Sequence, residues 1–217
     1  MARDYLGDEG EAIPHAEEIQ KADALPLADV DDEMLLRWLH RPSRRSDVAL
    51  ELVGRGGEEH LQALSEAMGR MDGADLEVLT PRLIELDEVG ETFFLDGLKS
   101  DSALLRIASA LALGKMKLRT AVVPLITAMC EHEEPEWKVQ ALALSRYSTA
   151  AVRMVEQFLR NPRGCEERLV FLTGALAMAG CDGQIQAMAQ ESDLTLASLA
   201  QKGWDRRHQV QMEMDAL

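Results

Sequence analysis

Aromatic residues are scarce in this chain: three Trp, two Tyr and four Phe make up 4% of its 217 residues. A compact β protein usually relies on more aromatic side chains than this to pack its sheets. The apolar residues that are present are mostly Ala and Leu, which are strong helix formers. No segment alternates apolar and polar residues for long enough to indicate a strand. The chain is therefore predicted to be all-α.

Cysteines are also few: Cys130, Cys165 and Cys181 are the only three. Their odd number and irregular spacing predict buried free thiols in a reducing compartment rather than a disulfide framework. The longest apolar run, residues 169–180, is too short to span a bilayer. The first residues carry no apolar segment typical of a signal peptide. We therefore expect a cytoplasmic protein that does not enter a membrane.

Positive charge is in short supply, and the formal net charge is −15. Residues 1–33 hold 11 acids and two bases, and residues 46–100 hold 13 acids and four bases. Between them, residues 34–45 hold four arginines and no acid, whereas residues 101–217 are nearly neutral, with 14 acids and 13 bases. The acidic excess repels phosphate and anionic lipid, which argues against nucleic-acid or membrane binding. It favours solubility and a basic partner.

The acidic residues 1–30 show only a broken apolar pattern, which predicts a mobile arm. Folding is expected to begin near Asp31, where acids precede an apolar face as they do at helix N-termini. The predicted domain therefore covers residues 31–217. Within it, apolar residues recur at helical spacings of three and four, as in the sets Leu61, Leu64, Met68 and Met71, and Leu104, Ile107 or Ala108, and Leu111.

A large apolar residue followed by a small one recurs near the end of every second predicted helix. The pairs are Val53-Gly54, Leu113-Gly114, Leu144-Ser145 and Leu176-Ala177, with Leu83-Ile84 as a copy that lacks the small residue. A period of roughly 30 residues in helical pairs is typical of a stacked solenoid. Before residue 100 the sequence also allows a second repeat register, offset by one helix. In this register residues 67–71 end a first helix and Thr80-Pro81 begins a second helix.

Residues 101–129 carry the most specific repeat. It resembles a bacterial HEAT repeat of the kind found in bilin-lyase-like proteins, through Leu105-Arg106, Ala112-Leu113-Gly114 and Val122-Val123-Pro124. Residues 135–160 match this pattern fairly well, and the other segments match it in spacing. The resemblance implies a right-handed α-solenoid of about five to six HEAT-like hairpins, whose second helices line the concave side.

Some HEAT-repeat proteins are enzymes, but this sequence lacks the catalytic and metal-binding motifs that those enzymes use. Di-iron HEAT hydroxylases repeat a His-Glu pair on several helices, whereas this chain has the one pair His132-Glu133. Cys130 and His132 lack the further ligands that a structural zinc needs. Neither a Gly-x-Ser-x-Gly turn nor a phosphate-binding glycine loop is present. We therefore expect no catalytic residue, no metal, no cofactor and no small-molecule ligand.

The expected function is that of a protein-interaction scaffold or adaptor that binds a protein or peptide through its row of second helices. Val152, Val155 and Leu159 form a stripe suited to burial, as do Ile185 and Met188. The polar residues left outward, predicted to contact a partner, are Arg153, Glu156, Gln157, Arg160, Gln184, Gln186 and Gln190; Phe93 or Phe94 is predicted to add an apolar spot.

Two alternatives stay open: a bilin-lyase-type enzyme or enzyme subunit, and a phosphate- or nucleic-acid-binding protein. The second rests on bases that gather after residue 114. They are interpreted as partner contacts, as a dock for the acidic arm, or as ordinary solvated positions: Lys115, Lys117, Arg119, Arg146, Arg153, Arg160 and Arg163. The C-terminal residues 204–217 are interpreted as a capping helix or as an adaptable Met-containing surface.

Overall fold

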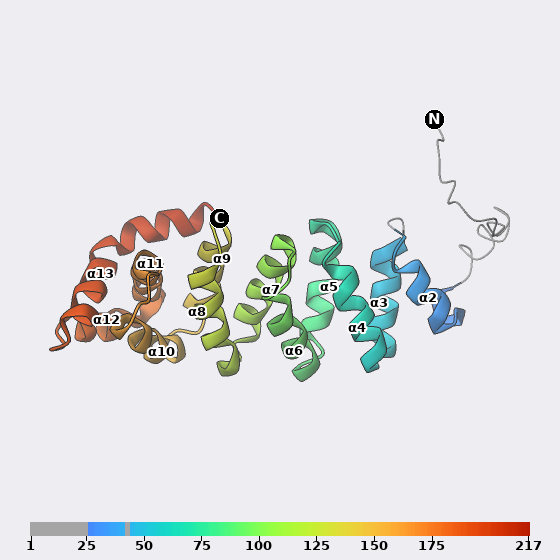
Figure 1. Cartoon of the computed structure of the whole chain (residues 1–217), viewed down its shortest axis with the longest axis horizontal. Helices are drawn as coiled ribbons and strands as arrows, with labels where there is room; N and C mark the ends of the chain where they lie inside the picture. The colour runs from blue at the N-terminus through green and yellow to red at the C-terminus, as the bar shows by residue number, and fades with distance from the viewer. Residues whose placement is uncertain (1–25, 42–43) are drawn as a thin grey trace, which may run out of the picture.

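A computed structural model of the chain describes residues 26–41 and 44–217. Every regular element in these two ranges is helical and none is a strand, which confirms the all-α prediction. The helices lie side by side in an elongated row that runs from α2 (Asp32–Trp38) to α13 (Leu194–Asp215) (Figure 1). No helix in the described part is both long and apolar enough to cross a membrane. Most of the expected acidic arm, residues 1–25, lies outside the described residues.

The helices between α2 and α13 alternate along the chain between two rows, and we call each first helix together with the second helix that follows it a hairpin. The first-helix row consists of α3 (Arg45–Arg55), α5 (Gly73–Ile84), α7 (Ala103–Met116), α9 (Glu136–Ser145) and α11 (Glu166–Leu176). The second-helix row consists of α4 (Glu58–Met68), α6 (Glu88–Gly97), α8 (Val122–Glu131), α10 (Thr149–Arg160) and α12 (Asp182–Ala189). Each first helix packs against the next first helix along the chain.

The start of the packed structure lies before the predicted boundary at residue 31. A short 3₁₀ turn, Leu27–Asp29, packs against α3, and Val30 is only 4% exposed. The Arg55 guanidinium donates to the Leu27 carbonyl oxygen at 2.7 Å. Asp31 then caps α2, as its place before an apolar face predicts, by accepting a hydrogen bond from the Met34 amide at 2.8 Å.

The predicted repeat register agrees with the helix boundaries. The large-small pairs fall at or next to the C-terminal ends of the first helices, as Leu113-Gly114 does in α7 and Leu144-Ser145 does in α9. The small residue has a steric reason at Gly114, where an added Cβ would lie 2.9 Å from the Cα of Ala143. The alternative register agrees with the structure at residues 67–71, where α4 ends, but not at Thr80-Pro81, which lies inside α5 and does not begin a helix.

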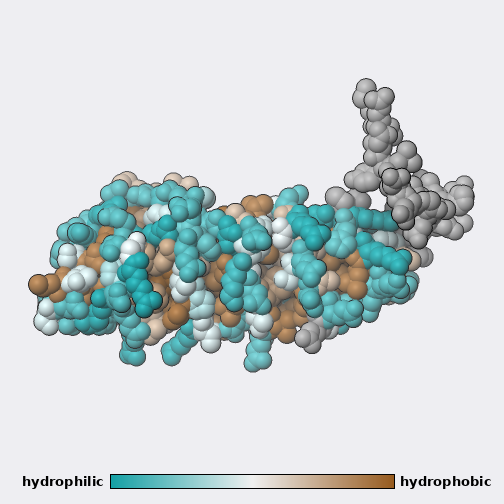
Figure 2. All heavy atoms as spheres, in the orientation of Figure 1, coloured by the Kyte–Doolittle hydropathy of each residue, from teal (hydrophilic) through white to brown (hydrophobic). Residues whose placement is uncertain are grey.

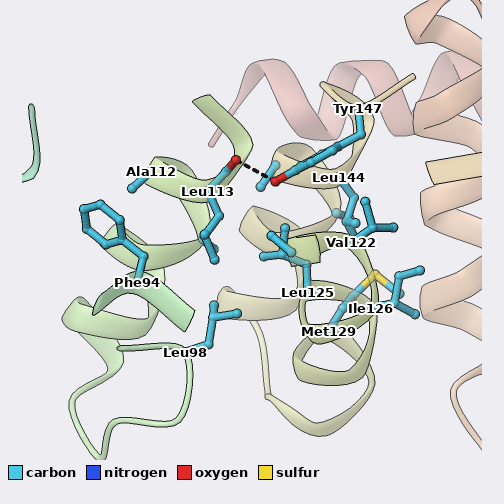
Figure 3. Close-up of a cluster of buried hydrophobic side chains, with 14 of the residues drawn as sticks. Phe94, Leu98, Ala112, Leu113, Val122, Leu125, Ile126, Met129, Leu144 and Tyr147 are labelled. Atoms are coloured by element: carbon cyan, nitrogen blue, oxygen red, sulfur yellow. Dashed lines mark hydrogen bonds between the residues drawn. The ribbon is translucent and has the colours of Figure 1, made fainter. Parts of the chain in front are cut away.

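Polar contacts at separations of about one repeat join neighbouring hairpins. Arg45 pairs with Asp75 at 3.7 Å, and Arg106 pairs with Glu136 at 2.6 Å. The Tyr147 hydroxyl donates to the Leu113 carbonyl oxygen at 2.6 Å inside the core (Figure 3). Around this bond, apolar side chains from neighbouring hairpins meet between the two rows: Phe94, Leu98, Ala112, Leu113, Val122, Leu125, Ile126, Met129 and Leu144.

Two of the three cysteines do not follow the sequence prediction. Cys130, near the end of α8, and Cys165, just before α11, form a disulfide with their Cα atoms 5.3 Å apart. Cys181 is free and buried, and burial raises the pKa of its thiol. The prediction of three free thiols is therefore wrong for the pair. Its 35-residue separation is close to one repeat, so the stack brings the two residues together.

We expect the disulfide to stabilise the second half of the row. Replacing both residues, Cys130→Ser with Cys165→Ser, should lower the free energy of unfolding by about 3–4 kcal/mol, because the unfolded chain then regains the entropy of an open loop of this length. Urea denaturation without reductant measures the loss. Reductant should lower the free energy of unfolding of the unmodified protein to that of the double variant. If the urea midpoint of the unmodified protein does not change when reductant is added, the disulfide pairing is contradicted.

Candidate partner-binding groove

The buried stripes predicted on α10 and α12 are confirmed. Val152, Val155 and Leu159 of α10 are at most 4% exposed, and Ile185 and Met188 of α12 are at most 5% exposed. The polar residues predicted to face outward are exposed, except for the half-buried Glu156: Arg153, Gln157, Arg160, Gln184, Gln186 and Gln190. Helical period therefore separates the buried and outward sides of these two helices correctly.

The outward residues of α10 have different neighbours. Arg153 lines a cavity of about 520 Å³ together with Arg119 and Tyr147. Gln157 lines another cavity, of about 520 Å³, next to the disulfide. Arg160 is held by Glu156 at 2.8 Å and by Asp193 at 3.3 Å, so its guanidinium connects α10 to the N-cap of α13. The hydrogen bond that Arg160 donates to Glu156 raises the pKa of Arg160.

The predicted aromatic spot needs correction. Phe94 is fully buried in the core (Figure 3), so it offers no surface to a partner. Phe93 is 7% exposed and lines a cavity of about 610 Å³ between α4 and α6. Helical spacing alone did not reveal how deeply the neighbouring hairpins cover these adjacent rings.

An opening with mainly apolar walls lies on the first-helix row, between α5 and α7. This α5–α7 groove has a volume of about 450 Å³. Its walls are mainly apolar, with Leu76, Thr80, Pro81 and Ile84 on α5 and Leu104, Ile107, Ala108 and Leu111 on α7; the acid Glu77 of α5 also lines it. Leu104 is 47% exposed, and Ile107, Ala108 and Leu111 are half-buried. Figure 2 shows apolar side chains reaching the surface in the middle of the row.

The apolar set on α7 that shows the helical spacing is not the side of this helix that enters the core. The core is reached instead by the other side of α7, through Leu105, Ala112 and Leu113, each at most 2% exposed. Because α7 is apolar around most of its circumference, periodicity could not tell which side faces inward. The side of α7 that carries Leu104 and Leu111 therefore lies outside the core.

Positive side chains gather at one end of the α5–α7 groove. Lys115 of α7 and Arg146, which follows α9, are both part of its lining. Lys117 and Arg119 follow Lys115 in the same turn, and Arg153 shares the next cavity with Arg119. We call Lys115, Lys117, Arg119, Arg146 and Arg153 the basic turn. Within residues 26–41 and 44–217, no carboxylate forms an ion pair with any of these five exposed side chains.

A second polar feature, which the sequence did not reveal, is an enclosed ion pair between α7 and α9. Arg106 donates to both carboxylate oxygens of Glu136, at 2.6 and 2.8 Å, and to the Ser100 carbonyl oxygen at 2.6 Å. The hydrogen bond from Arg106 holds the pKa of Glu136 below its ordinary value. His132 lies beside this pair, with its Nδ1 atom 2.7 Å from the Gln140 amide nitrogen. A repeat-length separation of 30 is the one signal that could have identified the pair.

The cysteine and histidine once considered as metal ligands are placed in other contacts. Cys130 is bonded to Cys165, and His132 faces Gln140. Across the part of the chain that the structure describes, no three His, Cys, Asp or Glu side chains are grouped as metal ligands would be. The α5–α7 groove is thus the candidate site, and its chemistry is that of an apolar surface with a cationic end.

Comparison of the chain with protein-family models, with curated proteins and with solved structures yields no match. A function for this chain therefore rests on its own residues and geometry.

Proposed function

We propose that this chain is a protein-interaction scaffold or adaptor, built as a HEAT-like right-handed α-solenoid. The observation that carries the proposal is the open α5–α7 groove, whose apolar walls have no counterpart from the described chain to cover them. A groove of this kind, with exposed leucine and a polar end, is typical of surfaces that bind another protein.

Two further features support the same proposal. Contacts between residues about one repeat apart, such as Arg106 with Glu136, are those of a stack in which each hairpin binds its neighbours. Such a stack presents a long surface rather than one enclosed active site. A second opening, between α4 and α6, adds exposed Val89 and the edge of Phe93 on the second-helix row, where the HEAT resemblance places partner contacts.

The test compares two lysine substitutions of matched exposure. Leu104→Lys places a charge in the groove, whereas Val123→Lys places one on α8 outside the groove; the two residues are 47% and 44% exposed. Affinity capture from an extract of the producing organism should retain a set of proteins with the unmodified chain and with Val123→Lys. Leu104→Lys should lose most of that set while keeping the same melting temperature. Equal capture by all three chains would rule out the groove as the binding surface.

A further inference from the structure

The chain itself contains a covered version of the α5–α7 groove. In the register that aligns Leu113 with Leu176, the groove residues Ile107, Ala108 and Leu111 correspond to Val170, Phe171 and Gly174 of α11. Val170 and Phe171 are 1% and 2% exposed, and Gly174 is buried. The same positions are therefore half-open on α7 and closed on α11.

Gly174 is closed by α13, whereas the Phe171 ring packs against the Trp137 ring of α9, with centroids 5.0 Å apart. An added Cβ at Gly174 would lie 3.0 Å from the Gly203 carbonyl oxygen and 3.1 Å from a methyl carbon of Val210. Figure 1 shows the second half of α13 lying over α11, with the C-terminus next to α9. An amphipathic helix thus covers the apolar positions of the first-helix row at this end of the stack.

The covering helix also makes ion pairs with the first-helix row: its Arg206 pairs with Glu167 of α11 at 2.8 Å, and an acid near its C-terminus contacts a base of α9. Glu213 of α13 pairs with Lys138 of α9 at 3.0 Å. Lys138 corresponds to Ile107 when Leu113 is aligned with Leu144, so it belongs to the same outward stripe. The hydrogen bond from Lys138 holds the pKa of Glu213 below its ordinary value. Apolar cover and an acid-base contact therefore occur together in the closed version.

The open α5–α7 groove has the same two features, an apolar surface and basic side chains, but no helix of the described chain covers it. Its walls provide the apolar stripe, and Lys115 and Arg146 provide two bases at one end, against the single acid Glu77 in the lining. The remainder of the basic turn extends the positive charge beyond the groove, while the chain as a whole carries −15. A local cationic end on an acidic protein orients an acidic ligand and rejects a basic one.

We propose that the α5–α7 groove binds an acidic amphipathic helix of a partner protein, which lies across α7 as α13 lies across α11. Its apolar face fills the groove against Leu104, Ile107 and Leu111, and its carboxylates pair with Lys115 and Arg146. This inference rests on the proposed scaffold function and specifies the partner's chemistry. It also differs from the expectation, based on net charge, that the partner is basic.

The experiment uses two synthetic helical peptides of about 18 residues, or five turns. Both carry leucines at helical spacings of three and four; one bears glutamates on the polar face and the other bears lysines. Fluorescence anisotropy with the full chain should give a dissociation constant about tenfold lower for the glutamate peptide. Leu104→Lys should weaken its binding by about tenfold, and Val123→Lys, at similar exposure outside the groove, should not.

The charge contact is tested by reversal. Lys115→Glu with Arg146→Glu should favour the lysine peptide over the glutamate peptide, because the charged end of the groove is inverted. Lys202 is an exposed residue of α13, outside the groove. Lys202→Glu therefore makes the same kind of charge change elsewhere and should leave the preference for the glutamate peptide intact. Equal affinity for both peptides, with Leu104→Lys still harmful, would overturn the acidic-partner inference and leave the scaffold function standing.

Other occupants of the groove are identified with a photo-crosslinking amino acid at position 104, which is 47% exposed. Crosslinks to the bound glutamate peptide are the expected result. Crosslinks to residues 1–25 of the same chain, or to a second copy of the chain, that persist in the presence of the peptide would overturn the inference. In those cases the differential capture by Leu104→Lys and Val123→Lys still reports separately on the scaffold function.

Discussion

Arg106→Ala should lower the free energy of unfolding by about 3 kcal/mol. Arg106 and Glu136 have side chains that are only 18% and 11% exposed, and the substitution leaves the carboxylate of Glu136 enclosed without its cation. The Arg106 guanidinium also bonds the Ser100 carbonyl oxygen, so one side chain holds the start of α7, the end of the preceding turn and the start of α9. Urea denaturation at neutral pH measures the change.

A matched control separates burial from the ion pair itself. Arg37 contacts Glu33 at the same 2.6 Å, but these side chains are 75% and 79% exposed. Arg37→Ala should leave the urea midpoint almost unchanged, because water solvates the remaining carboxylate. The double variant Arg106→Leu with Glu136→Leu should lose less stability than Arg106→Ala, since it removes both charges. Equal midpoints for Arg106→Ala and Arg37→Ala would contradict the enclosed role.

The same pair predicts a pH dependence. Because Arg106 lowers the pKa of Glu136 in the folded state, the unfolded chain binds this proton more readily than the folded chain does. The contribution of Glu136 is therefore fully present above its ordinary pKa of 4.5 and is lost as the pH falls through the lower folded value. The stability difference between the unmodified protein and Glu136→Gln should be constant near neutrality and shrink below about pH 4.5.

The all-α class and the two helix rows could be predicted from the sequence because they depend on local signals. Apolar spacing selects helices, and the large-small pairs mark the ends of first helices such as α7 and α9. The same spacing could not decide which side of α7 is buried, because Leu104 and Leu105 begin two equally apolar stripes. Only the neighbouring helices determine that Leu105 is enclosed and Leu104 is open.

Contacts between repeats were the part that sequence reasoning missed. The Cys130–Cys165 disulfide and the Arg106–Glu136 pair join residues 35 and 30 positions apart. Each residue alone has no local pattern that reveals a partner. Once the repeat length is established, however, polar or cysteine residues one repeat apart become candidates for contact, because successive hairpins stack in register. The basic turn was visible in the sequence, but its place at the end of an apolar groove was not.

Gly203→Ala should destabilise the C-terminal end of the row by about 2 kcal/mol, although alanine is the better helix former. The added Cβ would lie 2.7 Å from the Cβ of Thr173 and 2.8 Å from the Val170 carbonyl oxygen. Thr173 is fully buried and its hydroxyl donates to the Leu169 carbonyl oxygen, so it cannot turn away at low cost. The backbone of α13 must therefore move off α11, which opens the contact around Val210.

Trypsin digestion and urea denaturation together check this prediction. Arg206 and Arg207 lie just after the contact, so cleavage there should become faster in Gly203→Ala than in the unmodified chain. Gly183→Ala is the control: Gly183 lies on α12 with no atom within 4 Å of an added Cβ. Its only effect should be the gain in helix propensity, a small increase in the urea midpoint. If Gly203→Ala is as stable and as resistant to trypsin as Gly183→Ala, then α13 does not pack on α11 at this distance, and the covered version of the groove loses its structural basis.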